Sequence, residues 1–223
     1  MRPYAAQPEQ KSPYTDSEVT AILDGALKLN RGRGGYASHP ETFRLLLELM
    51  LETGMRVSDA LSFDPSRLEK GDSMWIYSYV QTKRKRGTRT KESDAYIPSR
   101  LKDAIDKCKW LSSAKPFWVG DQVDHYRLGY QVYDLMKQIG KRCDPKIDDC
   151  RPHRLRDTFA VRALRRGIAI GDLSRLLGHS SVRITEEYYA KWTPERARRL
   201  ERVMAQSLGH ADGSLSTPTA QAS

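Results

Sequence analysis

The sequence has no long apolar run. Its longest stretches of this kind, such as Phe43 to Leu51, contain charged residues and end well before the length of about 20 residues that a membrane-spanning helix needs. The first residues also lack the basic, apolar and small-residue order of a secretory signal. We therefore expect a soluble protein of the cytoplasm with no membrane partner.

Cysteine is scarce as well. Only three occur, Cys108, Cys143 and Cys150, so one would stay unpaired in any disulfide scheme. None forms a CxxC pair, the usual spacing of a zinc site. A metal site made of Cys143, Cys150 and His153 is an alternative, but ordinary reduced thiols near a functional histidine are the interpretation that we adopt. The sequence thus predicts no metal and no cofactor.

Acidic residues are absent from one long basic segment. Between Gln81 and Lys91 the chain has six basic residues and no acid, a second basic concentration runs from Arg151 to Arg166, and the formal net charge is +10. Such a charge indicates a polyanionic partner, most commonly nucleic acid. Either run alone could instead be a solvated face or a loop. The candidate DNA-binding residues are Arg84, Lys85, Arg86, Arg89, Lys91 and Arg154.

The composition favours one domain between two tails, without internal repeats. Residues 1–13 are rich in proline and glutamine and residues 208–223 in small polar residues, so both are expected to be flexible. Between them, residues 14–207 form the predicted domain, with a last helix at about 194–207. The 39% of hydrophobic residues in the 223-residue chain is enough for a core.

The predicted elements are mostly helical. Thr15-Asp16-Ser17-Glu18 is a capping box that opens a first helix, and a second begins after Pro40 and stops at Gly54. Further helices are expected at about 98–109, 130–141 and 155–166.

A short sheet interrupts these helices. Ser73 to Val80 is rich in aromatic and β-branched residues and predicts a strand, and Ala95 to Ile97 could pair with it. The basic segment between them would form the tip of a hairpin. The order of helices, sheet and helices predicts a mainly α, α+β domain.

Five motifs occur along the chain in the order "TGMRVSDAL", "TK", "HRLR", "LLGHSSV" and "ITEEYYAKW". In this order they resemble the catalytic signature of the tyrosine recombinases, also called the phage integrase family. One motif alone is weak, because HxxR or LGH occurs in many helical proteins, but five with matching spacing are specific. The resemblance covers about residues 14–207. It implies helices around a small antiparallel sheet or hairpin, and an enzyme that breaks and rejoins DNA through a 3′-phosphotyrosine without metal or ATP.

The resemblance assigns a role to each motif. Arg56 and Arg156 would bind the nonbridging oxygens of the phosphate, since guanidinium binds them bidentately and stays charged. Tyr188 would be the nucleophile, because a phenol can be displaced again when the strand is rejoined. Lys83 would protonate the departing 5′ oxygen, with Lys85 as its rival.

Two histidines and an aspartate complete the expected site. His153 and His179 would hydrogen-bond the scissile phosphate, and His153 is the one assigned to proton handling at the tyrosine. Asp59 follows Arg56 by three residues and would support His153 or orient an arginine.

The adjacent tyrosines differ in their match to the family pattern. Thr185 and Tyr188 fit its T-x-x-Y, which leaves Tyr189 as a neighbour. Ile184 and the two glutamates after Thr185 depart from the pattern, where many relatives have a second threonine and neutral residues. Carboxylates beside the nucleophile could slow its attack or point into solvent.

Each of these residues also has a purely structural interpretation. Arg56 at a helix start could simply pair with Asp59. His153 could cap its helix, and His179 could end another helix in the left-handed conformation.

Other functions compete with the recombinase. A helix-turn-helix regulator could be built from residues 171–191, where a short apolar helix, a glycine-centred turn and a second helix follow one another. That function leaves Arg56, Lys83 and the HxxR motif unexplained. A type IB topoisomerase would use the same chemistry, and a degenerate recombinase would bind DNA without cutting it.

The partners expected from the resemblance are double-stranded DNA and further copies of the chain. The family implies a tetramer on two duplexes, joined through C-terminal helices, and hence association with the nucleoid; the C-terminal helix could instead pack on its own domain. Many relatives carry a core-binding domain ahead of the catalytic domain, and about a dozen residues precede the first predicted helix here. Either the chain is a catalytic fragment, with weak and poorly specific binding, or it is a compact recombinase.

Overall fold

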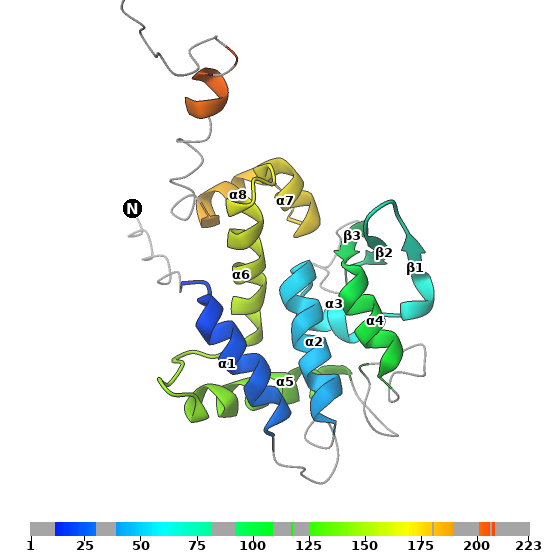
Figure 1. Ribbon diagram of the computed structural model, residues 1–223, viewed down its shortest axis with the longest axis vertical. Coiled ribbons are helices and arrows are strands. Elements are labelled where there is room, and N and C mark those ends of the chain that lie inside the picture. Colours follow the sequence, from blue (N-terminus) through cyan, green and yellow to red (C-terminus); the bar gives the residue numbers. More distant parts are fainter. Residues whose placement is uncertain are drawn as a thin grey trace, which may run out of the picture.

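The computed structural model describes residues 12–29, 39–81, 92–108, 117, 125–179, 181–189, 201–205 and 207. Over these ranges the protein is mainly helical with one small antiparallel sheet, so the predicted fold class is confirmed (Figure 1). In the same ranges, no helix is both long and apolar enough to cross a membrane.

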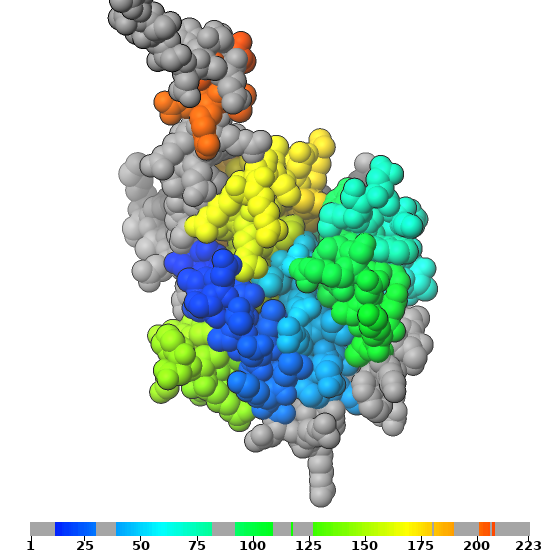
Figure 2. Space-filling view, in the orientation of Figure 1, coloured from blue at the N-terminus to red at the C-terminus, as the bar shows by residue number. Residues whose placement is uncertain are grey.

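The second helix, α2 (Pro40–Thr53), lies at the centre of the domain. It is preceded by α1 (Asp16–Leu27), whose predicted capping box forms with both of its hydrogen bonds. Buried residues cover most of the surface of α2, and a stripe of four charged residues, Glu41, Arg44, Glu48 and Glu52, stays at least partly exposed. It contacts α1, α6, α4 and the sheet, and Figure 2 shows these elements closely packed on one face of the molecule.

The sheet has the strand order β1-β2-β3, with both neighbouring pairs antiparallel. The predicted hairpin is present as β2 (Trp75–Val80) and β3 (Glu92–Ile97). On β3, buried and exposed residues alternate, so one face packs on the core. The first strand, β1 (Leu68–Lys70), was not predicted, because two of its three residues are charged and exposed.

Six more α-helices complete the described part of the domain. A short α3 (Val57–Leu61) follows α2 directly, and α4 (Ser99–Lys107) follows the sheet. The remaining helices are α5 (His125–Arg142), α6 (Pro152–Arg165), α7 (Ile170–Leu176) and α8 (Val182–Tyr189). The last three enclose a second, smaller core, whose buried members are Ala160, Val161, Ala163, Leu173, Leu177 and Tyr189.

Tyr14 anchors the segment before α1 to the start of α6. Its hydroxyl donates to the carbonyl of Arg151 at 3.0 Å and accepts from the amide of Arg151 at 2.7 Å. The guanidinium of Arg154 lies over the Tyr14 ring, 4.0 Å from its centroid, and donates to the carbonyl of Ser12 at 3.0 Å. These contacts fix the first turn of α6, which carries the HxxR motif.

The same contacts correct one expectation from the sequence. Arg154 was predicted to bind DNA, but it is buried and its guanidinium is engaged by the N-terminal segment. Ser12 was assigned to a flexible tail, yet its carbonyl takes part in this packing. A basic residue in a charged run can serve the core, since guanidinium stacks well on an aromatic ring.

Gly54 ends α2 with a φ of 67°, and a Cβ at this position would lie 2.4 Å from the Phe159 ring. We expect Gly54→Ala to cost about 2 kcal/mol, because both the left-handed conformation and the contact oppose a side chain. Thermal denaturation should show a Tm lower by about 4–8 °C.

Gly171 is the matched control for this substitution. It lies in α7, and nothing stands within 4 Å of a Cβ added there. We expect Gly171→Ala to raise the Tm slightly, since alanine is favoured over glycine in helices by about 0.5–1 kcal/mol. Equal losses in the two variants would contradict this account of Gly54.

Candidate active site

Arg56 stands between α2 and α3, at the N-cap of α3. Its Nη1 donates to Oε1 of Gln81 at 2.8 Å and lies 3.8 Å from Oδ2 of Asp59. The Asp59 side chain is fully buried beneath it. The expected role of Asp59 in orienting an arginine is therefore compatible with its position, and the structural pairing with Arg56 is present as well.

Arg156 lies on α6 and is only 3% exposed. Its Nη1 donates to the carbonyl of Gly54 at 2.7 Å, and its Nη2 donates to the carbonyl of Leu177. The guanidinium thus joins the end of α2 to the end of α7. Because arginine has five N–H donors, two bonds to carbonyls leave others for an anion.

Two positive charges face each other in this region. Burial, and after it the charge of Arg56, lower the pKa of Arg156 to about 10. The group is still protonated at neutral pH. Two guanidiniums held close together and partly desolvated favour a shared anion such as a phosphate.

His153, on the first turn of α6, shares a cavity of about 400 Å³ with both arginines. Partial burial lowers the pKa of the His153 imidazole, and the charges of Arg156, Arg151 and Arg56 act in the same direction, whereas Asp157 opposes them. The imidazole is consequently neutral at pH 7 and can accept a proton.

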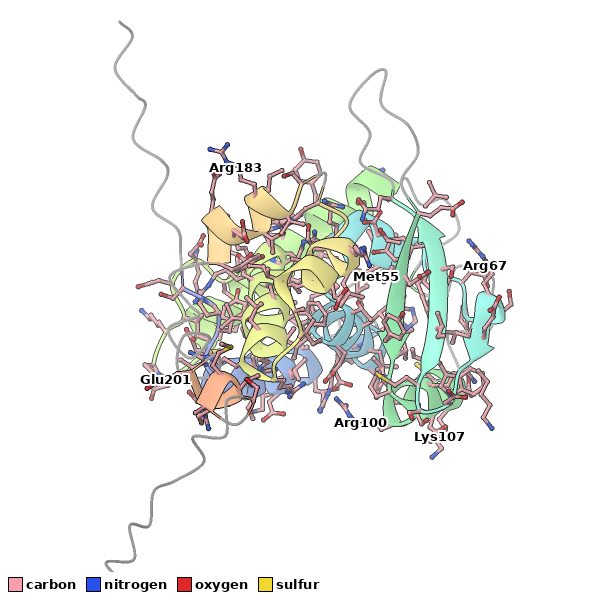
Figure 3. The ribbon with its side chains drawn as sticks, turned by 90° about the horizontal axis from the view of Figure 1, so that it is seen from above. Met55, Arg67, Arg100, Lys107, Arg183 and Glu201 are labelled. Atoms are coloured by element: carbon pink, nitrogen blue, oxygen red, sulfur yellow. The ribbon has the colours of Figure 1, made fainter. Side chains whose placement is uncertain are left out.

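The turn between α7 and α8 carries His179. Gly178 has a φ of 62°, so it is Gly178, and not His179, that adopts the left-handed conformation after α7. Nδ1 of His179 lies 2.8 Å from Oγ1 of Thr185, which is fully buried on α8. This hydrogen bond fixes the orientation of the His179 ring relative to α8, the helix that carries Tyr188. Met55 lines the same cavity as Arg56, His153 and Arg156, and Figure 3 shows it between the helices and the sheet.

The two tyrosines of α8 have different surroundings. Tyr189 is 2% exposed and its hydroxyl donates to Oδ1 of Asp157 at 3.1 Å. The Tyr188 ring meets Tyr189 edge to face at 4.9 Å and is only partly buried. Burial raises the pKa of Tyr188, the Asp157 charge adds to this, and Arg151 opposes it. The phenol therefore stays protonated until a base takes its proton.

Asp157 is a residue that the sequence reasoning missed. It is buried, follows His153 by one helical turn, and accepts the hydrogen bond from Tyr189. The signal available in the sequence was a carboxylate directly after the second arginine of "HRLRD", inside an otherwise apolar helix face.

We expect Asp157→Asn to raise stability at pH 7. Burial raises the pKa of Asp157 above the ordinary value of about 3.9 despite the nearby His153. A carboxyl pKa that is raised in the folded state means that ionisation of the carboxyl group lowers the stability of the fold. The stabilisation is present at low pH, where Asp157 is protonated, and is lost as pH rises through the folded-state pKa. The amide avoids this loss and still accepts from Tyr189.

Thermal denaturation of both proteins at pH 7 and pH 5 measures this effect. The Tm advantage of Asp157→Asn should be a few degrees at pH 7 and smaller at pH 5. A lower Tm for the variant at pH 7 would mean that the carboxylate is stabilised by its neighbours in the ionised form.

The glutamates that depart from the family pattern lie on the exposed side of α8. Glu187 accepts from Nε of Arg183 at 2.7 Å, one helical turn away. Figure 3 shows Arg183 pointing outward from the body of the protein. The carboxylate of Glu187 therefore pairs with Arg183 at the surface and is not directed at Arg56 and Arg156.

Several predicted residues lie outside the described residues. These are the candidate proton donors and the basic positions of the hairpin: Lys83, Lys85, Arg84, Arg86, Arg89 and Lys91. The base of the hairpin is described, however, and Gln81 at the end of β2 contacts Arg56 directly. The described part of the hairpin thus ends beside Arg56, at Gln81, which precedes Lys83 by two residues in the sequence.

The cysteines are free thiols. Burial raises the pKa of Cys150 to about 11, which makes it an unreactive thiol at neutral pH. Within the described ranges, no three His, Cys, Asp or Glu side chains gather as metal ligands would.

Comparison with known proteins identifies the family. The sequence pattern of the phage integrase family matches residues 14–196. The chain therefore belongs to the phage integrase family. A tyrosine recombinase XerA of Saccharolobus solfataricus is 30% identical over 148 residues, which are 65% of this chain and 44% of that protein. A tyrosine recombinase XerC of Staphylococcus aureus is 23% identical over 152 residues, which are 65% of this chain and 47% of that protein. The chain spans less than half the length of these curated relatives.

Solved structures agree with the fold. The Tn1549 transposon integrase in complex with transposon right end DNA has a TM-score of 0.64 at 20% identity, covering 91% of this chain and 69% of that chain. The catalytic domain of bacteriophage HP1 integrase has a TM-score of 0.56 at 18% identity, covering 88% of this chain and 96% of that chain. The fold is thus that of integrase catalytic domains.

Proposed function

We propose that the protein is a site-specific DNA recombinase of the integrase kind, which cleaves and rejoins strands through a covalent 3′-phosphotyrosine. The observation that carries this proposal is the meeting of Arg56, His153 and Arg156 at one cavity. Tyr188 stands on α8, which packs against α7, and α7 packs against α6. The names of the matched relatives, tyrosine recombinases, support the same reaction type.

The arginines are proposed to bind the scissile phosphate. A phosphodiester is negatively charged, and its transition state concentrates further charge on the nonbridging oxygens. Arg56 and Arg156 can both donate paired hydrogen bonds to such oxygens. Since a bound anion also relieves the repulsion between the two guanidiniums, phosphate binding is favoured between them.

In the proposed step, the phenolic oxygen of Tyr188 attacks phosphorus and the bond from phosphorus to the 5′ oxygen breaks. The phenol proton passes to neutral His153, while Lys83 protonates the departing oxygen, with Lys85 as the alternative donor. His179 donates a hydrogen bond to the phosphate. A 5′ hydroxyl later attacks the phosphotyrosine and restores the phenol. The covalent bond conserves the energy of the diester, so ATP is not required, and the side chains supply the positive charge that a metal ion would otherwise provide.

Double-stranded DNA is the proposed substrate. The basic residues between β2 and β3 are proposed to contact its phosphates, and Arg154 is left out of this interface because it is buried. Phosphate contacts orient a protein on DNA but carry no base sequence. The contacting residues proposed are Arg84, Lys85, Arg86, Arg89 and Lys91.

We also propose a tetramer on two duplexes, joined through C-terminal helices. Residues 201–205 are helical, and Val203 and Met204 are 51% and 48% exposed. Apolar side chains exposed side by side on a helix suit docking onto a second surface. Acting on chromosomal DNA, the assembly would lie in the cytoplasm on the nucleoid.

Covalent capture of DNA tests the proposed function. The full chain is mixed, in EDTA and without ATP, with nicked duplexes drawn from DNA flanking its gene, and the adduct is read on a denaturing gel and by peptide mass mapping. An adduct on Tyr188 supports the recombinase. Binding without an adduct on all of these duplexes would favour the degenerate recombinase or the helix-turn-helix regulator.

A further inference from the structure

We infer that Gln81 is a positioning residue that holds Arg56 in its phosphate-binding orientation. This inference rests on the proposed function and adds to it a buried group outside the recombinase motifs. Gln81 follows β2 and is 6% exposed. A polar side chain buried to this extent requires hydrogen-bond partners, and its partners define what it does.

The two ends of the Gln81 amide contact different elements. Oε1 accepts from Nη1 of Arg56 at 2.8 Å, and Nε2 donates to Oγ of Ser93 at 2.8 Å. Because a guanidinium can only donate, the oxygen of the amide has to face Arg56 and the nitrogen has to face Ser93. Ser93 is 6% exposed on β3, so the sheet fixes the amide from behind.

Gln81 also packs against the turn that carries His179. A Cβ built on Gly178 would lie 1.4 Å from Nε2 of Gln81, so only glycine leaves room for the amide. The carbonyl of Leu177, next to Gly178, accepts a hydrogen bond from Arg156. Gln81 therefore fills the space between Arg56 and the segment that joins Arg156 to His179.

The Gln81 amide accepts a hydrogen bond from Nη1 of Arg56, whereas Oδ2 of the nearby Asp59 carboxylate does not. Nη1 of Arg56 lies 3.8 Å from Oδ2 of Asp59, which is too long for a hydrogen bond. The bond to Gln81 is short and directional. It is also neutral, so it orients the guanidinium without offsetting the positive charge that the phosphate needs.

The first test is the rate of single-turnover cleavage by Gln81→Leu, a variant of similar size that makes neither hydrogen bond. We expect cleavage to slow by about 100-fold, the effect of a catalytic group displaced by about 1 Å, with unchanged DNA affinity. Ser93→Ala is the matched control, because it leaves the bond to Arg56 in place, and it should slow cleavage by less than about 5-fold. Equal effects of the two variants would overturn the inference.

Two further comparisons identify the group through which Gln81 acts. On a duplex with a 5′-bridging phosphorothiolate, the leaving sulfur needs no proton, so a defect of Lys83→Ala should disappear while that of Gln81→Leu persists. Arg56→Lys with Gln81→Leu should cleave no more slowly than Arg56→Lys alone, since coupled residues are not additive. The inference would be overturned if the phosphorothiolate duplex restored the cleavage rate of Gln81→Leu. It would also be overturned if the loss of rate in the double variant equalled the product of the losses in the two single variants.

A measurement without DNA separates this inference from the proposed function. In the folded chain, NMR of the arginine side chains reports rotation about the Cζ–Nε bond of Arg56, which the bond to Gln81 should slow. We expect faster rotation in Gln81→Leu and not in Ser93→Ala. Unchanged rotation would overturn the inference even if the chain cleaves DNA, and faster rotation would support it even if no adduct formed.

Discussion

Tyr188→Phe is expected to abolish the covalent protein–DNA adduct and leave DNA binding unchanged. The substitution removes only the phenolic oxygen, which is the proposed attacking atom, from a partly buried ring. The arginines that are proposed to bind phosphate are held by Gln81, Gly54 and Leu177 and do not depend on that oxygen. The loss should therefore be complete for cleavage and small for affinity, as judged by a suicide duplex and by electrophoretic mobility shift.

Tyr189→Phe is the matched control, one residue further along α8. It removes the hydrogen bond to buried Asp157, so stability should fall by about 1 kcal/mol, while the adduct still forms. An adduct that survived Tyr188→Phe but vanished with Tyr189→Phe would move the nucleophile to Tyr189.

Arg156→Lys is expected to reduce cleavage by about 1000-fold. Lysine keeps the charge but cannot donate a pair of parallel hydrogen bonds to phosphate oxygens, and the loss of one such donor costs about 100-fold to 1000-fold in other enzymes. It also cannot join the carbonyls of Gly54 and Leu177 in the way that the guanidinium does. The rate should be measured under single-turnover conditions on protein shown to be folded by circular dichroism.

Arg154→Lys controls for the burial of an arginine on the same helix. Arg154 stacks on Tyr14 and bonds to the carbonyl of Ser12, away from the cavity of Arg56 and Arg156. Its substitution should lower the Tm but leave the cleavage rate of the folded fraction nearly unchanged. Similar rate losses in the two variants would show that the defect of Arg156→Lys arises from folding.

Sequence patterns correctly predicted the helix ends that are determined by neighbouring residues in the chain. The capping box at Thr15 and Glu18 satisfies helix amides three residues away, and Gly54 relieves a conformation of its own backbone. Such signals depend on neighbours in the chain, so they can be read without the fold. Element bounds shifted where packing extended a helix, as in α5, which begins at His125 and not near Tyr130.

Contacts between distant residues were out of reach of the sequence. Arg154 and Arg156 are two residues apart and both basic, yet one stacks on Tyr14 and the other lies beside Arg56. Tyr188 and Tyr189 are adjacent, yet Tyr189 is buried and donates to Asp157 on α6, whereas Tyr188 is only partly buried. Helix periodicity turns neighbouring residues to different sides, and the partner on each side is set by tertiary packing.

The sequence by itself determined the order of the motifs, the helices around a small sheet and the family to which both point. Only the tertiary structure decided that Gln81 lies between Arg56 and Gly178 and that Asp157 faces Tyr189. The reason is physical: a motif records which chemical groups are present, whereas the orientation of a buried polar group is set by hydrogen-bond partners that the folded chain brings from other elements.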